Sequence, residues 1–176
     1  YRYVGNQPSG LIDPSGLETL VIINGPTSGN PFGHTAIAAT GSGIYSPGNN
    51  PNDPSLNFAG SGVTDYLADQ AKRRESVAFV IPTTPEQEKA IIDYMKEKKT
   101  KPNSFPDNCA TRVGDALNAG NVKLADPFMP GVSLPTMPFP STLFRALQDL
   151  ESKGGAKGIA IPKNSPISPN FNSFNP

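Results

Sequence analysis

The sequence predicts an α+β fold, in which short strands and amphipathic helices share one domain. Runs rich in β-branched residues, bounded by turn residues, predict strands at 20–23, 34–40, 44–45 and 77–81. Helical spacing of apolar residues predicts helices at 64–74, 84–98, 109–119 and 141–152. The 176 residues include 20 Pro and 17 Gly, so loops occupy much of the backbone and long helical bundles are excluded.

The predicted strands are justified by the residues that end them. The run Leu20 to Ile23 stops at an Asn-Gly-Pro turn, which indicates a buried strand. The segments 34–40 and 44–45 flank Gly41-Ser42-Gly43, a pattern typical of a hairpin with a glycine-rich turn. Val77 to Ile81 is the remaining clear strand.

The predicted helices carry start and stop signals. Thr84-Pro85-Glu86-Gln87 combines a cap, a proline suited to the first turn and a Gln that can bond back to the cap. The helix from Cys109 follows an Asp-Asn pair able to cap it, and Gly120 ends it. Beyond Lys163 the chain is rich in Pro, Asn and Ser, which predicts a flexible or loosely docked tail.

Composition excludes several classes of function. Fifteen basic and fifteen acidic residues give no net charge, so we expect no nucleic-acid partner. A single Cys, Cys109, and a single His, His34, exclude an internal disulfide and a Cys- or His-rich metal site, and we expect no cofactor. No apolar run approaches the roughly 20 residues of a membrane span, and the first residues lack a secretory signal pattern.

The first seventeen residues differ in composition from the rest of the chain. Their sequence, YRYVGNQPSGLIDPSGL, resembles the closing phrase of RHS-repeat cores in the residues Tyr3, Val4, Gly5, Asn6, Pro8, Asp13, Pro14, Ser15, Gly16 and Leu17. The resemblance implies that 1–17 ends an RHS shell, that the shell cuts itself between Leu17 and Glu18, and that a secreted toxin begins at Glu18. It also implies delivery into a target cell, a secretion apparatus and a cognate immunity protein as partners. The alternative is an ordinary turn-rich N-terminal tail.

Cys109 and His34 are the only thiol and imidazole available to a mechanism. A helix N-terminus and a nearby imidazole both activate a thiol, and Cys109 begins a predicted helix. First-turn amides of that helix could also bind a developing oxyanion. A buried structural Cys and a structural His are the alternative interpretation.

The phrases Gly33-His34 and Asn108-Cys109-Ala110-Thr111-Arg112-Val113 resemble the circularly permuted papain-like superfamily, which includes NlpC-like hydrolases and lecithin retinol acyltransferase-like enzymes. Arg112 stands where that family usually has an aromatic residue. The resemblance, covering about Leu20 to Leu150, implies a small antiparallel sheet packed against helices, a Cys109 nucleophile and a His34 base. It also implies a third polar residue that orients the imidazole: Ser46 is nearest that position, with Tyr45 and Asn49 as alternatives, or Ser46 is only a turn residue.

We therefore expect residues 1–17 to end an RHS core, 18–155 to form a papain-like toxin domain, and 156–176 to form a tail. The expected activity is cysteine-dependent hydrolysis of an amide or ester in a peptide, peptidoglycan or lipid. Three alternatives stay open: a lipid acyl hydrolase or acyltransferase, a glutamine deamidase or transglutaminase-type toxin, and a non-catalytic binding module. The apolar stretch 128–139 could receive an acyl chain or simply pack over the core.

Overall fold

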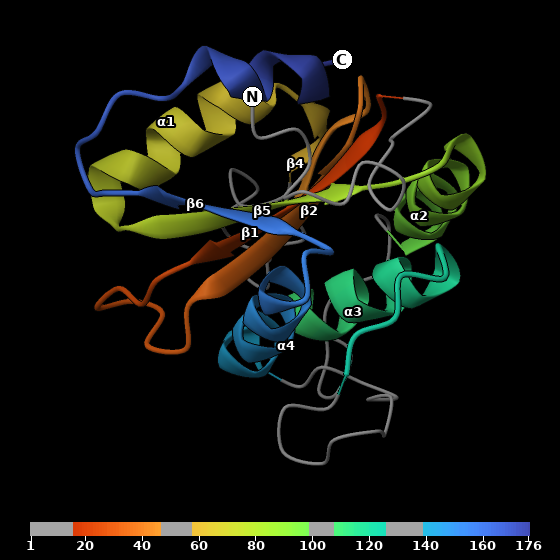
Figure 1. The fold of residues 1–176 in the computed structure, drawn as a ribbon. Helices are drawn as coiled ribbons and strands as arrows, with labels where there is room; N and C mark the ends of the chain where they lie inside the picture. Colours follow the sequence, from red (N-terminus) through yellow and green to blue (C-terminus); the bar gives the residue numbers. More distant parts are fainter. Residues whose placement is uncertain (1–15, 47–57, 99–107, 126–138) are drawn as a thin grey trace, which may run out of the picture.

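The computed structural model describes residues 16–46, 58–98, 108–125 and 139–176 and forms one six-stranded sheet between two layers of helices (Figure 1). The strands are β1 (Glu18–Asn24), β2 (His34–Ala39), β3 (Gly43–Ser46), β4 (Phe58–Ser61), β5 (Ser76–Pro82) and β6 (Lys157–Ile161). Their order is β4-β3-β2-β1-β5-β6, and every neighbouring pair is antiparallel. The predicted α+β fold with an antiparallel sheet is confirmed.

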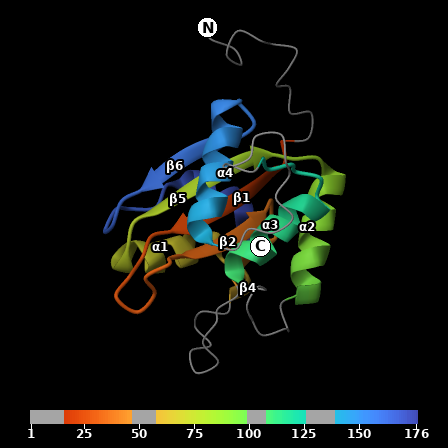
Figure 2. The same cartoon turned by 90° about the horizontal axis from the view of Figure 1, so that it is seen from below.

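Helices cover both faces of the sheet. They are α1 (Val63–Arg73), α2 (Pro85–Lys98), α3 (Cys109–Ala119), α4 (Pro140–Ser152) and the 3₁₀ helix η3 (Pro169–Phe174). Helices α1 and η3 lie on one face, and α2, α3 and α4 lie on the other (Figures 1 and 2). The predicted helices are observed with ends shifted by only a few residues.

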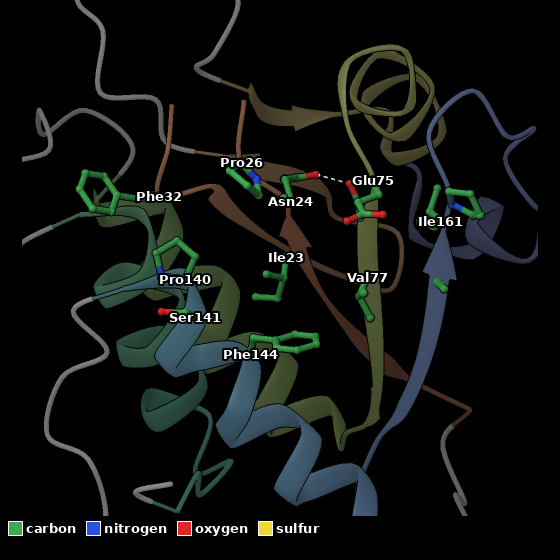
Figure 3. A pocket seen from close by; sticks show the side chains of 14 residues that line it. Ile23, Asn24, Pro26, Phe32, Glu75, Val77, Pro140, Ser141, Phe144 and Ile161 are labelled. Atoms are coloured by element: carbon green, nitrogen blue, oxygen red, sulfur yellow. Dashed lines mark hydrogen bonds between the residues drawn. The ribbon is translucent and has the colours of Figure 1, made fainter. Parts of the chain in front are cut away.

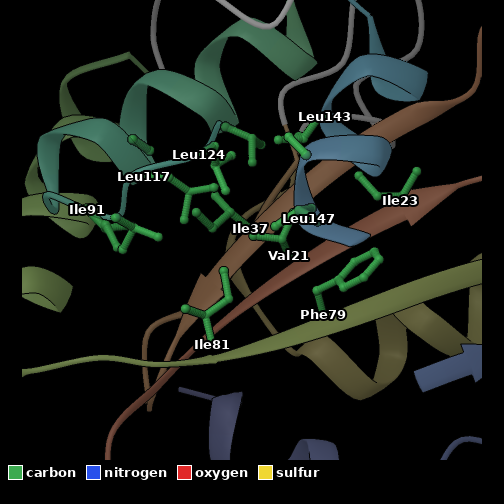
Figure 4. Close-up of a cluster of buried hydrophobic side chains, with 14 of the residues drawn as sticks. Val21, Ile23, Ile37, Phe79, Ile81, Ile91, Leu117, Leu124, Leu143 and Leu147 are labelled. Atoms are coloured by element: carbon green, nitrogen blue, oxygen red, sulfur yellow. The ribbon is translucent and has the colours of Figure 1, made fainter. Parts of the chain in front are cut away.

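Each face of the sheet has its own hydrophobic core, because alternate residues of a strand point to opposite faces. In β1, Val21 and Ile23 pack in the cluster under α2, α3 and α4, shown in Figure 4. Leu20 and Ile22 pack in the cluster under α1 and η3. Burial on both faces explains why β1 is a continuous apolar run and not an alternating one.

The C-terminal segment differs from the predicted loose tail. Residues 157–161 form edge strand β6, and Phe171 and Phe174 of η3 are each only 1% exposed. Asn175 Oδ1 accepts hydrogen bonds from Val63 N (2.7 Å) and Thr64 N (3.2 Å), capping α1 after Gly62, which has no side chain to do so. The Pro-, Asn- and Ser-rich composition predicted a loose tail, but two buried phenylalanines and one helix cap are enough to dock the segment.

Several sequence-based expectations fall on residues outside the described ranges. These residues are 1–15, 47–57, 99–107 and 126–138, and they include most of the RHS-like phrase, Asn49 and most of the apolar stretch before Phe139. Leu17 is described, and its carbonyl accepts a hydrogen bond from Thr83 N at 3.0 Å, directly before β1. Within the described ranges, no helix has the length and apolar content that crossing a bilayer demands.

Candidate functional site

Polar residues from four strands meet at one end of the sheet, on the α1 face. In the strand register, Asn24 at the end of β1 stands between His34, which begins β2, and Ser76, which begins β5. Ser46 ends β3 on the same side. Gly33 brings the chain into β2 with φ +77, and a Cβ at this position would lie 2.5 Å from Asn24 O, so only glycine fits beside β1.

A continuous set of hydrogen bonds joins these residues to α1, and we call it the polar chain. Its links are Ser76 Oγ to Asn24 Oδ1 (2.7 Å), Asn24 Nδ2 to Tyr66 Oη (2.8 Å), Ser46 Oγ to Tyr66 Oη (3.3 Å) and His34 Nε2 with Ser46 Oγ (2.7 Å). The structure thus brings His34 together with Ser46, the nearest of the candidates for the polar residue that the family resemblance implied. Tyr45, an alternative partner, packs instead in the cluster under α2, α3 and α4.

The surroundings keep the imidazole neutral. Burial, and next the positive charge of Arg74, lower the pKa of His34 from 6.5 to about 4. Arg74 is itself 8% exposed and donates to Gln70 Oε1 (2.9 Å) and Gly25 O (3.0 Å). Burial also raises the pKa of Tyr66 to about 12, so its hydroxyl stays protonated at neutral pH. His34 is therefore a neutral base above about pH 4.

Cys109 is the first residue of α3, and the residue is of intermediate exposure. The side chain of Asn108 caps the helix by accepting from Ala110 N (2.9 Å) and Thr111 N (3.1 Å). The cap therefore occupies two of the first-turn amides that were expected to be available to an oxyanion. Across the described ranges, the amide of Cys109 has no hydrogen bond, so it is the first-turn donor left for an oxyanion.

Cys109 and His34 belong to different layers of the fold, on opposite faces of the sheet. Helix α3 packs in the core opposite α1, whereas His34 belongs to the α1 side, two residues before Ala36. In the part of the chain that the structure describes, no hydrogen bond joins the Cys109 sulfur to the imidazole. Cys109 is also a minor electrostatic contributor to the raised pKa of Tyr66, after burial.

A pocket of about 340 Å³ adjoins the polar chain between α4 and the ends of β1, β5 and β6 (Figure 3). Its wall is mainly apolar and includes Ile23, Val77 and Phe144, which lie close together in Figure 3. Asn24 and Ser76 belong both to this wall and to the polar chain. The pocket therefore borders the Asn24–Ser76 end of the polar chain, whereas His34 and Cys109 do not line it.

Two exposed phenylalanines mark the same region. Phe32 lines the pocket and is 71% exposed, and Phe139, the residue before α4, is 45% exposed. Their ring centroids are 6.1 Å apart. Large exposed apolar side chains beside a pocket are typical of ligand sites.

Sequence reasoning missed Asn24, Tyr66, Ser76 and Arg74. Asn24 was interpreted as a turn residue and Tyr66 as part of a core-facing helix surface. One signal was available: period-two spacing places Asn24 on the same buried face as Leu20 and Ile22, where a polar side chain needs a partner.

The described residues contain no group of three His, Cys, Asp or Glu side chains arranged to hold a metal ion. Comparisons of the chain with protein families, curated proteins and solved structures gave no significant match. The candidate site therefore stands on its own geometry.

Proposed function

We propose that the chain is a cysteine hydrolase that cleaves an amide or ester bond, with Cys109 as nucleophile and His34 as base and then acid. The observation that carries the proposal is the 2.7 Å contact of His34 Nε2 with Ser46 Oγ, which leaves Nδ1 of a neutral imidazole available to a thiol. The position of Cys109, a residue of intermediate exposure at the capped start of α3, supports it.

In this mechanism His34 acts as a general base during the attack, because its imidazole is neutral at rest. The Cys109 sulfur bonds to the substrate carbonyl carbon while the thiol proton passes to His34 Nδ1. The bond from that carbon to nitrogen or oxygen breaks, and the leaving group takes the proton. Water then hydrolyses the thioester and restores the thiol. The thiol and Nδ1 must meet in the substrate complex, and such contacts are often longer in the free enzyme.

The pocket between α4 and the ends of β1, β5 and β6 supports a substrate with an apolar group. It favours acyl esters of lipids as a second candidate substrate beside peptide amides, because its wall is mainly apolar.

We also propose, from the resemblance of residues 1–17, that the enzyme is a toxin released from an RHS protein and neutralised by an immunity protein.

Alkylation by iodoacetamide tests the Cys109–His34 pair without knowledge of the substrate. At pH 6.5 we expect His34→Ala to slow alkylation of native Cys109 by about tenfold or more, because base assistance is lost. Tyr94→Phe serves as a control, since its hydroxyl donates to Asp115 on α3, away from His34. Equal rates in wild type and His34→Ala, with both proteins folded, would contradict the proposal.

The acyl-enzyme would identify the substrate. Wild type is incubated with separated bacterial proteins, peptidoglycan or lipids, quenched with acid and weighed by mass spectrometry. We expect an added mass on the Cys109 peptide with one fraction and none with Cys109→Ala. A mass equal to a fatty acyl group would select the lipid candidate, and one equal to a peptide acyl group would select the amide candidate. If no fraction gives an adduct on Cys109 and none of its components is cleaved, the result would favour a non-catalytic binding module.

A further inference from the structure

The polar chain has a direction that its first two links set. Ser76 Oγ donates to Asn24 Oδ1 at 2.7 Å, so the oxygen of the amide faces Ser76. The nitrogen of the same amide then faces Tyr66 and donates to its hydroxyl oxygen at 2.8 Å. The hydrogen bond with β5 thus orients an amide on β1 toward the phenol on α1.

The next hydrogen bonds connect Tyr66 to the histidine through Ser46. Tyr66 Oη accepts from Asn24 Nδ2 and also from Ser46 Oγ at 3.3 Å. A serine hydroxyl has one proton to donate, and that of Ser46 goes to Tyr66. The 2.7 Å contact between Ser46 Oγ and His34 Nε2 therefore needs a hydrogen on Nε2. Nδ1 is left with its lone pair.

Burial keeps this arrangement from being replaced by water. Asn24, Ser46 and Tyr66 are each 1% exposed, and Ser76 is 4% exposed. A buried polar group without a partner costs about 1–3 kcal/mol, so each group of the polar chain is expected to keep a hydrogen-bond partner. The ring of His34 thus contacts the Ser46 hydroxyl, whose proton is donated to Tyr66.

We propose that Tyr66 and Asn24 are positioning residues that hold His34 in the tautomer with hydrogen on Nε2, so that Nδ1 accepts the thiol proton. Its catalytic consequence rests on the proposed hydrolase function, whereas the tautomer itself depends only on the hydrogen bonds. Neither residue touches the reacting atoms. Both act through Ser46, whose contact with the imidazole fixes which nitrogen is the base.

The single histidine of the chain makes the tautomer directly measurable. Protein labelled with ¹⁵N in its imidazole ring gives one pair of ring-nitrogen signals, which at pH 7 should show a protonated Nε2 and an unprotonated Nδ1. Tyr66→Phe keeps the ring and removes the acceptor oxygen, so the Ser46 hydroxyl turns to donate to Nε2. We then expect the signals to shift toward the tautomer with hydrogen on Nδ1. Tyr94→Phe, the matched control, should leave both signals unchanged.

Ser46→Ala provides a second variant if Tyr66→Phe does not fold. It removes the only partner of Nε2 among the described residues, and the spectrum should move to a mixture of tautomers. A folded Tyr66→Phe or Ser46→Ala protein whose ring-nitrogen signals match those of wild type would overturn the proposal. A wild-type spectrum with hydrogen on Nδ1 would overturn it as well.

Kinetics with p-nitrophenyl butyrate as the probe separate this proposal from the proposed function. We expect Tyr66→Phe to lower kcat by about 100-fold or more with KM changed less than about twofold, because the wrong tautomer leaves no base at Nδ1. A tautomer shift without any loss of turnover would support the hydrogen-bond direction and overturn the role of His34 as base. An unshifted tautomer with turnover lost in Cys109→Ala would overturn the positioning role and leave the hydrolase standing.

Discussion

The two faces of the sheet use the same strands for different purposes. On the face under α2, α3 and α4, the strand ends carry mainly apolar side chains such as Ile23 and Val77. On the α1 face, the neighbouring residues Asn24 and Ser76 are polar, buried and joined by hydrogen bonds. Moving one residue along a strand changes the face, so an apolar core and a buried polar chain coexist in one small sheet.

This difference predicts different consequences of substitution. Apolar packing is spread over many contacts and contributes mainly to the free energy of unfolding. A buried polar chain contributes little net stability per hydrogen bond but sets directions and protonation states. We therefore expect substitutions in the polar chain to change activity more than stability, and substitutions in the apolar core of the opposite face to do the reverse.

The largest expected effect is loss of turnover in Cys109→Ala and His34→Ala. Each should lower kcat/KM for p-nitrophenyl butyrate by about 1,000-fold or more, and the double variant should be no worse, because residues of one catalytic unit are not additive. Cys109 lies at a helix start and is partly exposed, so Cys109→Ala should cost about 1 kcal/mol or less in the free energy of unfolding. Full turnover in His34→Ala would remove the mechanism, since the chain has no other His.

Leu147→Ala tests the expected role of the apolar face in stability. Leu147 on α4 is fully buried, and its truncation should lower the free energy of unfolding by about 2–5 kcal/mol in urea titrations. The kcat per folded molecule should stay within about twofold of wild type. Ser46→Ala, on the other face, should show the opposite balance. If Leu147→Ala abolished turnover while folded, the separation of roles between the faces would be wrong.

Stability should depend on pH through His34. Its pKa is about 4 in the folded chain against 6.5 in the unfolded chain, so between these values the unfolded state binds the extra proton. The stability contributed by the neutral imidazole is fully present above pH 6.5 and is lost as the pH falls through about 4. The free energy of unfolding should fall by up to about 1.4 kcal/mol per pH unit in this window. The difference between wild type and His34→Gln, measured in urea at each pH, should carry this slope, and a constant difference would contradict it.

A smaller effect tests the charge of Arg74. Burial is the larger cause of the lowered His34 pKa, and Arg74 is the second. NMR titration of Arg74→Gln should therefore give a His34 pKa that is raised but closer to 4 than to 6.5. Arg74→Lys retains the charge and should leave the pKa near its wild-type value. A pKa that is unchanged in Arg74→Gln would show that burial alone is responsible.

The smallest effect is expected for a chain that begins at Glu18. It loses the hydrogen bond from Thr83 N to Leu17 O, but its new ammonium group lies beside Thr40 Oγ1, 2.9 Å from Glu18 N. That hydroxyl is 3.0 Å from the carboxylate of Glu88, which is 6% exposed. We expect Tm to stay within about 4 °C of the longer chain, and turnover to be unchanged. A fall of more than about 10 °C would show that residues before Glu18 belong to the folded domain.

Local chemistry by itself determined much of this protein. Runs of β-branched residues, the glycine-rich turn of the hairpin and the capping residues Thr84 and Asn108 place most strands and helices to within a few residues. The family resemblance, with a count along the hairpin, placed Ser46 nearest His34 among several alternatives, and these two residues are only 12 apart. The sequence predicts short-range structure wherever turn and cap preferences are strong.

The tertiary structure alone decided the rest. Asn24 meets Tyr66 across 42 residues and Ser76 across 52, and Asn175 caps α1 from 112 residues away. No local preference encodes such pairs, since each depends on which elements the packing of the two cores brings side by side. The direction of the polar chain, and with it the tautomer of His34, therefore arises only when β1, β2, β3, β5 and α1 are assembled.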